Sequence, residues 1–177
     1  MTTDAESIQN LYTSGQYEID ADRSSISFQG RSLWGMMPVR GRFDDFAGTG
    51  RLRGGGEVTG QLVIDVPSLR TGMAKRDRHL TSQDFFHADR YPIITFTLAE
   101  VRFLPSDMVV VEGSLQVKDV VKQVSLSATL HAPDSESVHI GCRKLFDRTE
   151  FDISANQLGM VSNEVVIDAQ LRWTRSD

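Results

Sequence analysis

Apolar residues alternate with polar ones along most of this chain, and that two-residue period constrains the fold more than any other feature. Residues two apart point to the same face of a β-strand, so the pattern is typical of strands with one buried face. It recurs in about eight or nine short runs, which begin near residues 17, 26, 39, 62, 94, 109, 124, 151 and 165. Turn-forming residues separate most runs, and no helical pattern alternates with them. The chain is therefore predicted to be all-β and antiparallel, either a sandwich or a barrel.

Two stretches depart from this pattern. Within residues 1–15, Asp4 is placed to cap a short helix that Gly15 would end, which predicts a helical N-terminal extension. The connection over residues 67–90 is too long for a hairpin and contains good helix formers, so one or two short helices are expected there. No linker or repeat divides the chain, and residues 1–177 are predicted to form one domain.

Composition excludes several classes of function. The net charge of −5 argues against nucleic acid as a partner, because phosphate binding needs a concentrated basic face. The first sixteen residues contain two acids, no basic residue and no apolar run, so we expect neither a secretory signal nor a transmembrane segment. Cys142 is the only cysteine, which is compatible with a reducing compartment, and a cytoplasmic protein is expected.

The long connection is rich in charge and is the first place to look for chemistry. Arg76, Asp77 and His79 stand close together in it, but their spacing matches no metal site, and no metal is predicted. No nucleophile elbow accompanies His79, so no catalytic residue is assigned. A hydrogen-bonded network that holds the connection to the barrel is the preferred interpretation. A hydrolase or isomerase that uses Asp77 and His79 remains the alternative.

A large apolar set suggests either a filled core or a pocket. Methionine and aromatic side chains suit both, and glycines at Gly35, Gly41 and Gly113 remove volume from strand positions or strand ends. A closed barrel of about eight strands is either packed with side chains or able to hold one small ligand. If there is a channel, the residues expected to line it are Phe28, Leu33, Trp34, Met36, Met37, Phe43, Phe46, Phe85, Phe86 and Phe96.

Four stretches carry a resemblance to a known family. They are Tyr17-Glu18-Ile19-Asp20; Val39-x-Gly41-x-Phe43-x-x-Phe46-x-Gly48; Arg76-Asp77-x-His79-Leu80-x-Ser82-x-Asp84-Phe85-Phe86 with Tyr91-Pro92; and Val111-x-Gly113-x-Leu115 leading to Glu150-Phe151-Asp152-Ile153. In order and spacing the chain resembles the YceI-like family of lipid- and polyisoprenoid-binding proteins. The resemblance implies an extended, eight-stranded, antiparallel, lipocalin-like barrel with helices at its mouth. It also implies a channel for an isoprenoid quinone, a polyprenyl phosphate or a similar amphiphile, and a possible homodimer.

Together these observations predict a non-catalytic carrier of a long-chain lipid-like molecule that needs no cofactor. The residues expected either to meet the ligand head group or to form a structural network are Arg70, Lys75, Arg76, Asp77 and His79. Two alternatives stay open. One is the enzyme described above, and the other is a side-chain-filled barrel that acts through its surface in an oligomer.

Overall fold

The computed structural model describes residues 14–33, 35–53, 57–132, 134–156 and 160–176. The predicted N-terminal helix and Trp34 lie outside these residues. No helix among the described residues is both long and apolar enough to cross a membrane.

Almost all regular structure is β-strand. The strands are β1 (Gly15–Ile19), β2 (Ser25–Ser32), β3 (Met37–Phe43), β4 (Phe46–Leu52), β5 (Val58–Asp65), β6 (Leu69–Arg70), β7 (Ile93–Phe103), β8 (Met108–Val117), β9 (Val120–His131), β10 (Ser137–Asp147) and β11 (Glu164–Arg175). The α-helix α2 (Ala74–Thr81) lies in the long connection, and short 3-10 helices include η1 (Ala21–Arg23), η2 (Val66–Ser68) and η3 (Arg148–Phe151).

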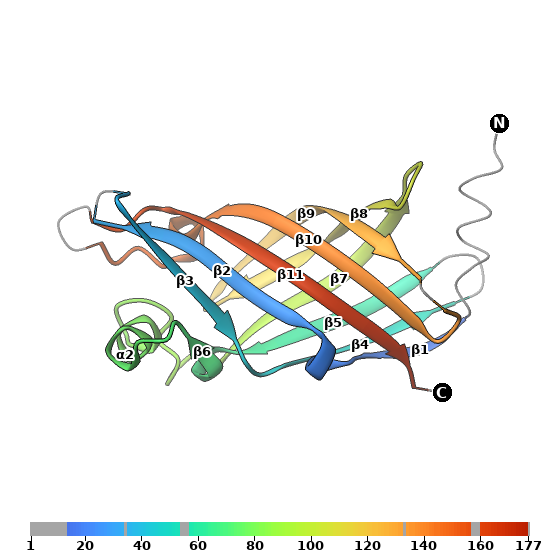
Figure 1. Cartoon of the computed structure of the whole chain (residues 1–177), viewed down its shortest axis with the longest axis horizontal. Helices are drawn as coiled ribbons and strands as arrows, with labels where there is room; N and C mark the ends of the chain where they lie inside the picture. Colours follow the sequence, from blue (N-terminus) through green and yellow to red (C-terminus); the bar gives the residue numbers. More distant parts are fainter. Residues whose placement is uncertain (1–13, 34, 54–56, 133, 157–159, 177) are drawn as a thin grey trace.

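The strands form one closed antiparallel barrel (Figure 1). Eight of them close the ring in the order β1-β4-β5-β7-β8-β9-β10-β11, because β11 pairs with β1. β2, β3 and β6 extend the sheet from β11. Since β11 pairs with both β1 and β2, these two strands are halves of one strand interrupted by η1. The prediction of an eight-stranded antiparallel barrel with a helix in the 67–90 connection is confirmed.

Three strands were missing from the prediction, namely β4, β10 and the two-residue β6, and one predicted strand is wrong. The inward-facing positions of β4 include Gly48 and Gly50, and those of β10 include Lys144. Neither strand therefore shows a regular alternation of apolar and polar residues in the sequence. Residues 151–153 are not a strand: Phe151 ends η3, and Asp152 follows with a left-handed φ of 56°. Phe151 and Ile153 are buried nevertheless, which explains why they resemble an inward strand row.

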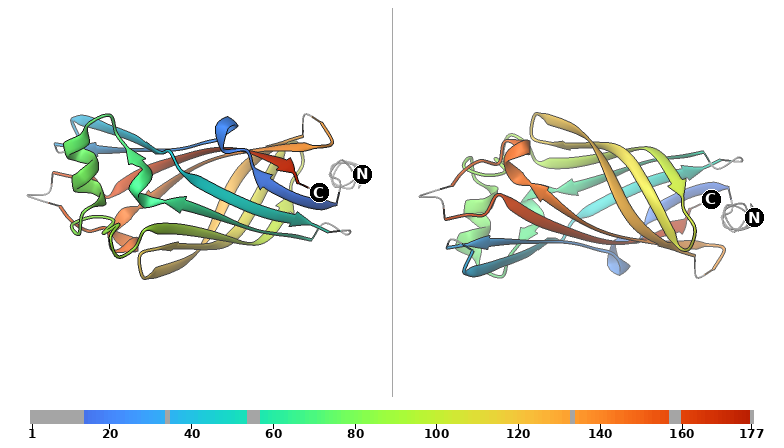
Figure 2. Two further views of the ribbon diagram at one scale, coloured as in Figure 1. Left: turned by 90° about the horizontal axis from the view of Figure 1, so that it is seen from below. Right: turned by 90° about the horizontal axis from the view of Figure 1, so that it is seen from above.

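The barrel is elongated, with α2 at one end and the end of β11 at the other (Figures 1 and 2). Its buried residues fall into two separate clusters. The larger one lies around α2 and the connection after it, and includes Phe43, Leu69, Phe85 and Phe151. The smaller one is formed by Val109, Ala128 and Leu130. Because the inward side chains between the clusters are only partly buried, the barrel interior is not a continuous core.

Candidate ligand-binding cavity

A cavity of about 560 Å³ occupies the barrel interior. Leu80, Phe85 and Phe86 line it beside α2, and Val109 and Leu130 line it in the region of the smaller cluster. It therefore runs between the two buried clusters along the barrel. Its volume lies within the range of roughly 300 to 1,000 Å³ that is usual for pockets enclosing small apolar ligands.

Glycines make room for aromatic rings against the barrel wall. A Cβ atom added to Gly41 would lie 2.3 Å from Phe28 Cζ, and one added to Gly113 would lie 2.5 Å from Phe96 Cζ. Both rings thus rest on the glycines instead of reaching into the centre, which keeps the interior open. Gly35 has a different role from the one expected. Its φ is +87° and a Cβ atom added to it would have no neighbour within 4 Å, so it serves the β2–β3 turn.

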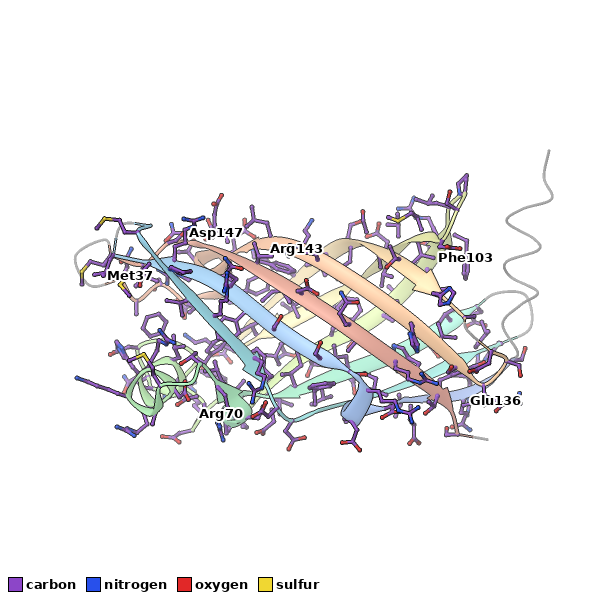
Figure 3. The ribbon with its side chains drawn as sticks, viewed as in Figure 1. Met37, Arg70, Phe103, Glu136, Arg143 and Asp147 are labelled. Carbon is purple, nitrogen blue, oxygen red and sulfur yellow. The ribbon has the colours of Figure 1, made fainter. Side chains whose placement is uncertain are left out.

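The structure divides the predicted apolar residues into two groups. Phe28, Phe43, Phe85, Phe86 and Phe96 lie on the cavity wall. Of the others that the structure describes, Phe46 packs in the larger buried cluster, and Leu33, Met36 and Met37 are exposed in the β2–β3 turn or at its end. None of these four side chains lines the cavity. For Leu33, Met36 and Met37 the reason is their exposure in the turn, where Figure 3 shows Met37 at the α2 end of the barrel.

The charged side chains on the wall are all basic. Among the described residues, no carboxylate lines the cavity, whereas Arg76, His79, Lys144 and Arg148 do. Arg31 and Arg51 also contribute to the wall, but they occupy outward positions on β2 and β4 and are exposed. The α2 end of the cavity is therefore electropositive.

Lys144 lies in β10, and Arg148 follows directly after it. Strand alternation places Lys144 in the inward row that contains Ile140, Cys142 and Phe146, and Arg148 is the first residue of η3, immediately after the strand ends at Asp147. β10 pairs with β9 only over His139–Cys142, so the two strands have separated by Lys144. Lys144 forms no ion pair with any described residue. Its ammonium group is thus available to a ligand.

Arg148 is a functional candidate that the sequence analysis did not find. It is only 7% exposed and donates hydrogen bonds to the carbonyl oxygens of Ser162 (2.8 Å), Ala155 (3.1 Å), Val161 (3.3 Å) and Ile153. Burial lowers the pKa of Arg148, but a guanidinium stays charged at neutral pH. Its guanidinium also lies 5.9 Å from the ring centre of Phe85. Arg148 therefore holds residues 153–155 and 161–162 in place while adding positive charge to the wall.

The predicted charged network splits into two parts. Asp77 Oδ1 accepts hydrogen bonds from Thr71 N (2.8 Å) and Thr71 Oγ1 (2.5 Å), and Arg76 Nε donates to the same Thr71 Oγ1 (2.8 Å). His79 faces a different carboxylate, with Nε2 3.5 Å from Asp84 Oδ2, and packs edge-on against Phe85. Asp77 and His79 are therefore not brought together, and Asp77 does not line the cavity. Arg70 and Lys75 are exposed and also lie off the wall.

The remaining reactive groups offer little for catalysis. Cys142 lies on the wall, and burial raises the pKa of its thiol, which keeps it in the unreactive protonated form. Among the residues with defined positions, no group of three or more potential ligands is arranged to hold a metal ion.

Comparisons with known proteins agree with this geometry. A family model described as a YceI-like domain matches residues 17–173. A UPF0312 protein of Photorhabdus laumondii is 35% identical over 118 residues, but the match spans only 64% of this chain and 60% of that protein.

Two of the solved structures that match show the same fold. BcnA of Burkholderia cenocepacia superimposes with a TM-score of 0.78 at 22% identity and covers 87% of this chain and 98% of its own. A polyisoprenoid binding domain from Saccharophagus degradans, implicated in plant cell wall breakdown, gives a TM-score of 0.74 at 19% identity. That match covers 90% of this chain and 98% of the other. Because the family model spans nearly the whole described barrel, the chain belongs to the YceI-like family.

Proposed function

We propose that this protein is a non-catalytic carrier that holds a long-chain amphiphile inside the barrel. The apolar cavity of about 560 Å³ is the observation that carries the proposal. Burying a hydrocarbon tail is worth about 25 cal/mol for each Å² of apolar surface, so tight binding needs no catalytic group. The likeness in fold to a polyisoprenoid binding domain supports a tail of the isoprenoid type.

We further propose that the head group is anionic and lies at the α2 end. Lys144, Arg76 and His79 line the wall there, and no carboxylate of the described wall opposes them. Lys144 and His79 are exposed, whereas Arg76 is partly buried, and a partly buried cation gains more from a ligand of opposite charge because the interior screens charge poorly. A polyprenyl phosphate is therefore favoured over a neutral isoprenoid quinone.

The test compares two ligands that differ only in the head group. Geranylgeranyl monophosphate and geranylgeraniol are titrated into the protein by calorimetry, and native mass spectrometry counts the bound molecules. We expect one molecule of either to bind, with the phosphate at least tenfold tighter. Equal affinities would refute the anionic head group, and binding of neither would refute the carrier function.

A matched pair of variants locates the head group. Lys144→Gln removes the inward cation, whereas Arg143→Gln removes its outward neighbour, which is 3.6 Å from Asp168 on the barrel surface. We expect Lys144→Gln to weaken phosphate binding with little change for the alcohol. Arg143→Gln should change neither the affinity for the phosphate nor the affinity for the alcohol. An equal effect of the two variants would place the head group elsewhere.

Two properties of the carrier remain proposals: a cytoplasmic location and a homodimer. Fractionation of the native host would test the first. Sedimentation velocity of the purified chain would test the second, and a single monomeric species over the micromolar range would contradict it.

A further inference from the structure

Exposed methionines gather at the α2 end of the barrel. Met36 and Met37, at the β2–β3 turn, are 73% and 53% exposed, and Met73, which immediately precedes α2, is 56% exposed. Figure 3 shows Met37 at this end and Phe103 at the opposite one. Large exposed apolar side chains that share one end of a molecule typically mark an interaction site.

Hydrogen bonds fix the described residues of the turn that carries Met36 and Met37. Arg31 Nη1 donates a hydrogen bond to Gly35 O (3.1 Å), and Met36 N donates to Leu33 O (3.1 Å). Leu33 has a φ of 50°, which is uncommon for a residue with a side chain. The local structure therefore holds the two methionines outward.

Basic residues share the two chain segments that hold these methionines. We define the docking surface as residues 31–33, 35–37 and 70–81, which hold Arg31, Arg70, Lys75, Arg76 and Arg78 but only one acid, Asp77, a net charge of +4. The rest of the chain holds 14 basic and 23 acidic residues, a net charge of −9. Asp84 adds one negative charge beside this surface, because its Oδ2 lies 3.5 Å from Nε2 of His79. The docking surface thus has the opposite charge to the rest of the molecule.

The same two segments also form part of the cavity wall. Arg76, His79 and Leu80 of α2 line the cavity, and so do Arg31 and Ser32 at the end of β2. Anything that binds the docking surface is therefore placed against the α2 end of the cavity.

We propose that the docking surface binds an anionic lipid bilayer and brings the cavity to the membrane. Apolar side chains ringed by Lys and Arg are the pattern that inserts into the headgroup region of such membranes. Each basic side chain near an anionic surface strengthens binding roughly fivefold. A second copy of this chain fits less well, because a symmetric contact would place a +4 surface against itself.

The test is sedimentation of the purified chain with phosphatidylcholine vesicles that contain either a third phosphatidylglycerol or none. We expect binding to the anionic vesicles that falls as salt is raised, and at least tenfold weaker binding to the neutral ones. Equal binding to both, or binding to neither, would overturn the proposal. No ligand is present, so this result is independent of the carrier test described above.

Paired variants locate the contact. Met36→Ser with Met37→Ser should weaken binding at least tenfold, whereas Leu104→Ser with Met108→Ser, which changes exposed apolar residues at the opposite end, should not. Melting temperatures verify that all variants fold. If both pairs of substitutions weakened vesicle binding equally, the assignment of the membrane contact to Met36 and Met37 would be refuted.

The charge is tested in the same way. Lys75→Glu with Arg78→Glu should weaken binding by about 30-fold or more, and Arg143→Glu on the barrel side should leave it near the original value. If sedimentation velocity shows that the methionine variants dissociate a dimer while vesicle binding is unchanged, the surface is a subunit interface and the membrane proposal is wrong.

Discussion

Gly30 offers a way to fill the cavity without disturbing the barrel. It lies on the cavity wall in the inward row of β2, opposite Val39. A Cβ atom placed there would have only ordinary contacts, 3.8 Å to Val165 Cγ2 and 4.0 Å to Glu164 O. Gly30→Leu should therefore direct four carbon atoms into the space that we assign to the ligand tail.

The expected magnitudes separate stability from binding. A glycine within a strand costs roughly 0.5 to 1 kcal/mol relative to a residue with a side chain, so the variant should melt about 1 to 4 °C higher. If each of the four added carbon atoms displaces one ligand methylene, the binding free energy weakens by about 0.8 kcal/mol per carbon atom, or roughly 3 kcal/mol in total. That loss corresponds to an affinity about 200-fold lower.

The assay pairs a melting curve with titration of geranylgeranyl monophosphate. A variant that melts at or above the original temperature and binds the ligand much more weakly supports a tail seated in the cavity. A stable variant with unchanged affinity would refute that placement. Gly41→Ala is the matched control on the paired strand, because its new atom would meet Phe28 Cζ at 2.3 Å and so should lower the melting temperature.

Four other outcomes are expected. Gly113→Ala should destabilise the fold by about 1 to 3 kcal/mol in urea unfolding, since the new Cβ would meet Phe96 Cζ and Thr97 O at 2.5 Å and the latter is backbone. Alkylation of Cys142 by iodoacetamide should be slow at pH 7, because burial raises its pKa, and slower still once a ligand covers it. Arg148→Met should cost more than about 3 kcal/mol in the same unfolding experiment, because it leaves several carbonyl oxygens without a donor. Hydrogen bonds from Thr149 lower the pKa of Asp147 below 3.8. The ionised carboxylate therefore stabilises the folded state above pH 3.8, and this stabilisation is lost as the pH falls through the lowered pKa. Asp147→Asn should accordingly reduce the fall in unfolding free energy that urea titrations record at acid pH.

The architecture could be predicted because it depends on local patterns. Alternation is a property of each strand alone, so the inward rows of β8 and β11 were evident without any knowledge of their neighbours. β4 was missed because Gly48 and Gly50 occupy its inward row. The space beside Gly48 is filled by Ile19 and Trp173, which come from two other strands. Such compensation exists only after the barrel has closed.

The candidate site was predicted less well for the same physical reason. In the sequence Arg148 resembles an ordinary surface residue, because the carbonyl acceptors of Ala155 and Ser162 that it binds are known only from the folded structure. Met36 and Met37 read as pocket residues, because composition alone does not show that both side chains are exposed. Phe28 and Phe96 lie on the cavity wall, where the sequence analysis expected them, since each occupies an inward position in a strand whose apolar residues alternate with polar ones.

The charge distribution links the two proposals. A molecule whose docking surface carries +4 while the rest of the chain carries −9 turns that surface toward an anionic membrane before contact, because the field acts over about a Debye length of 8 Å in physiological salt. The barrel side is repelled from the same surface, so contact would occur with the α2 end first. Lys144, Arg76 and His79 then add positive charge on the cavity wall itself. An anionic head group would therefore meet positive charge at each stage of its passage from bilayer to cavity. Lys75→Glu with Arg78→Glu, which removes only cations of the docking surface that do not line the cavity, should slow ligand uptake from vesicles while leaving the affinity for dispersed ligand unchanged. A loss of that affinity would contradict the proposal that the two steps use different side chains.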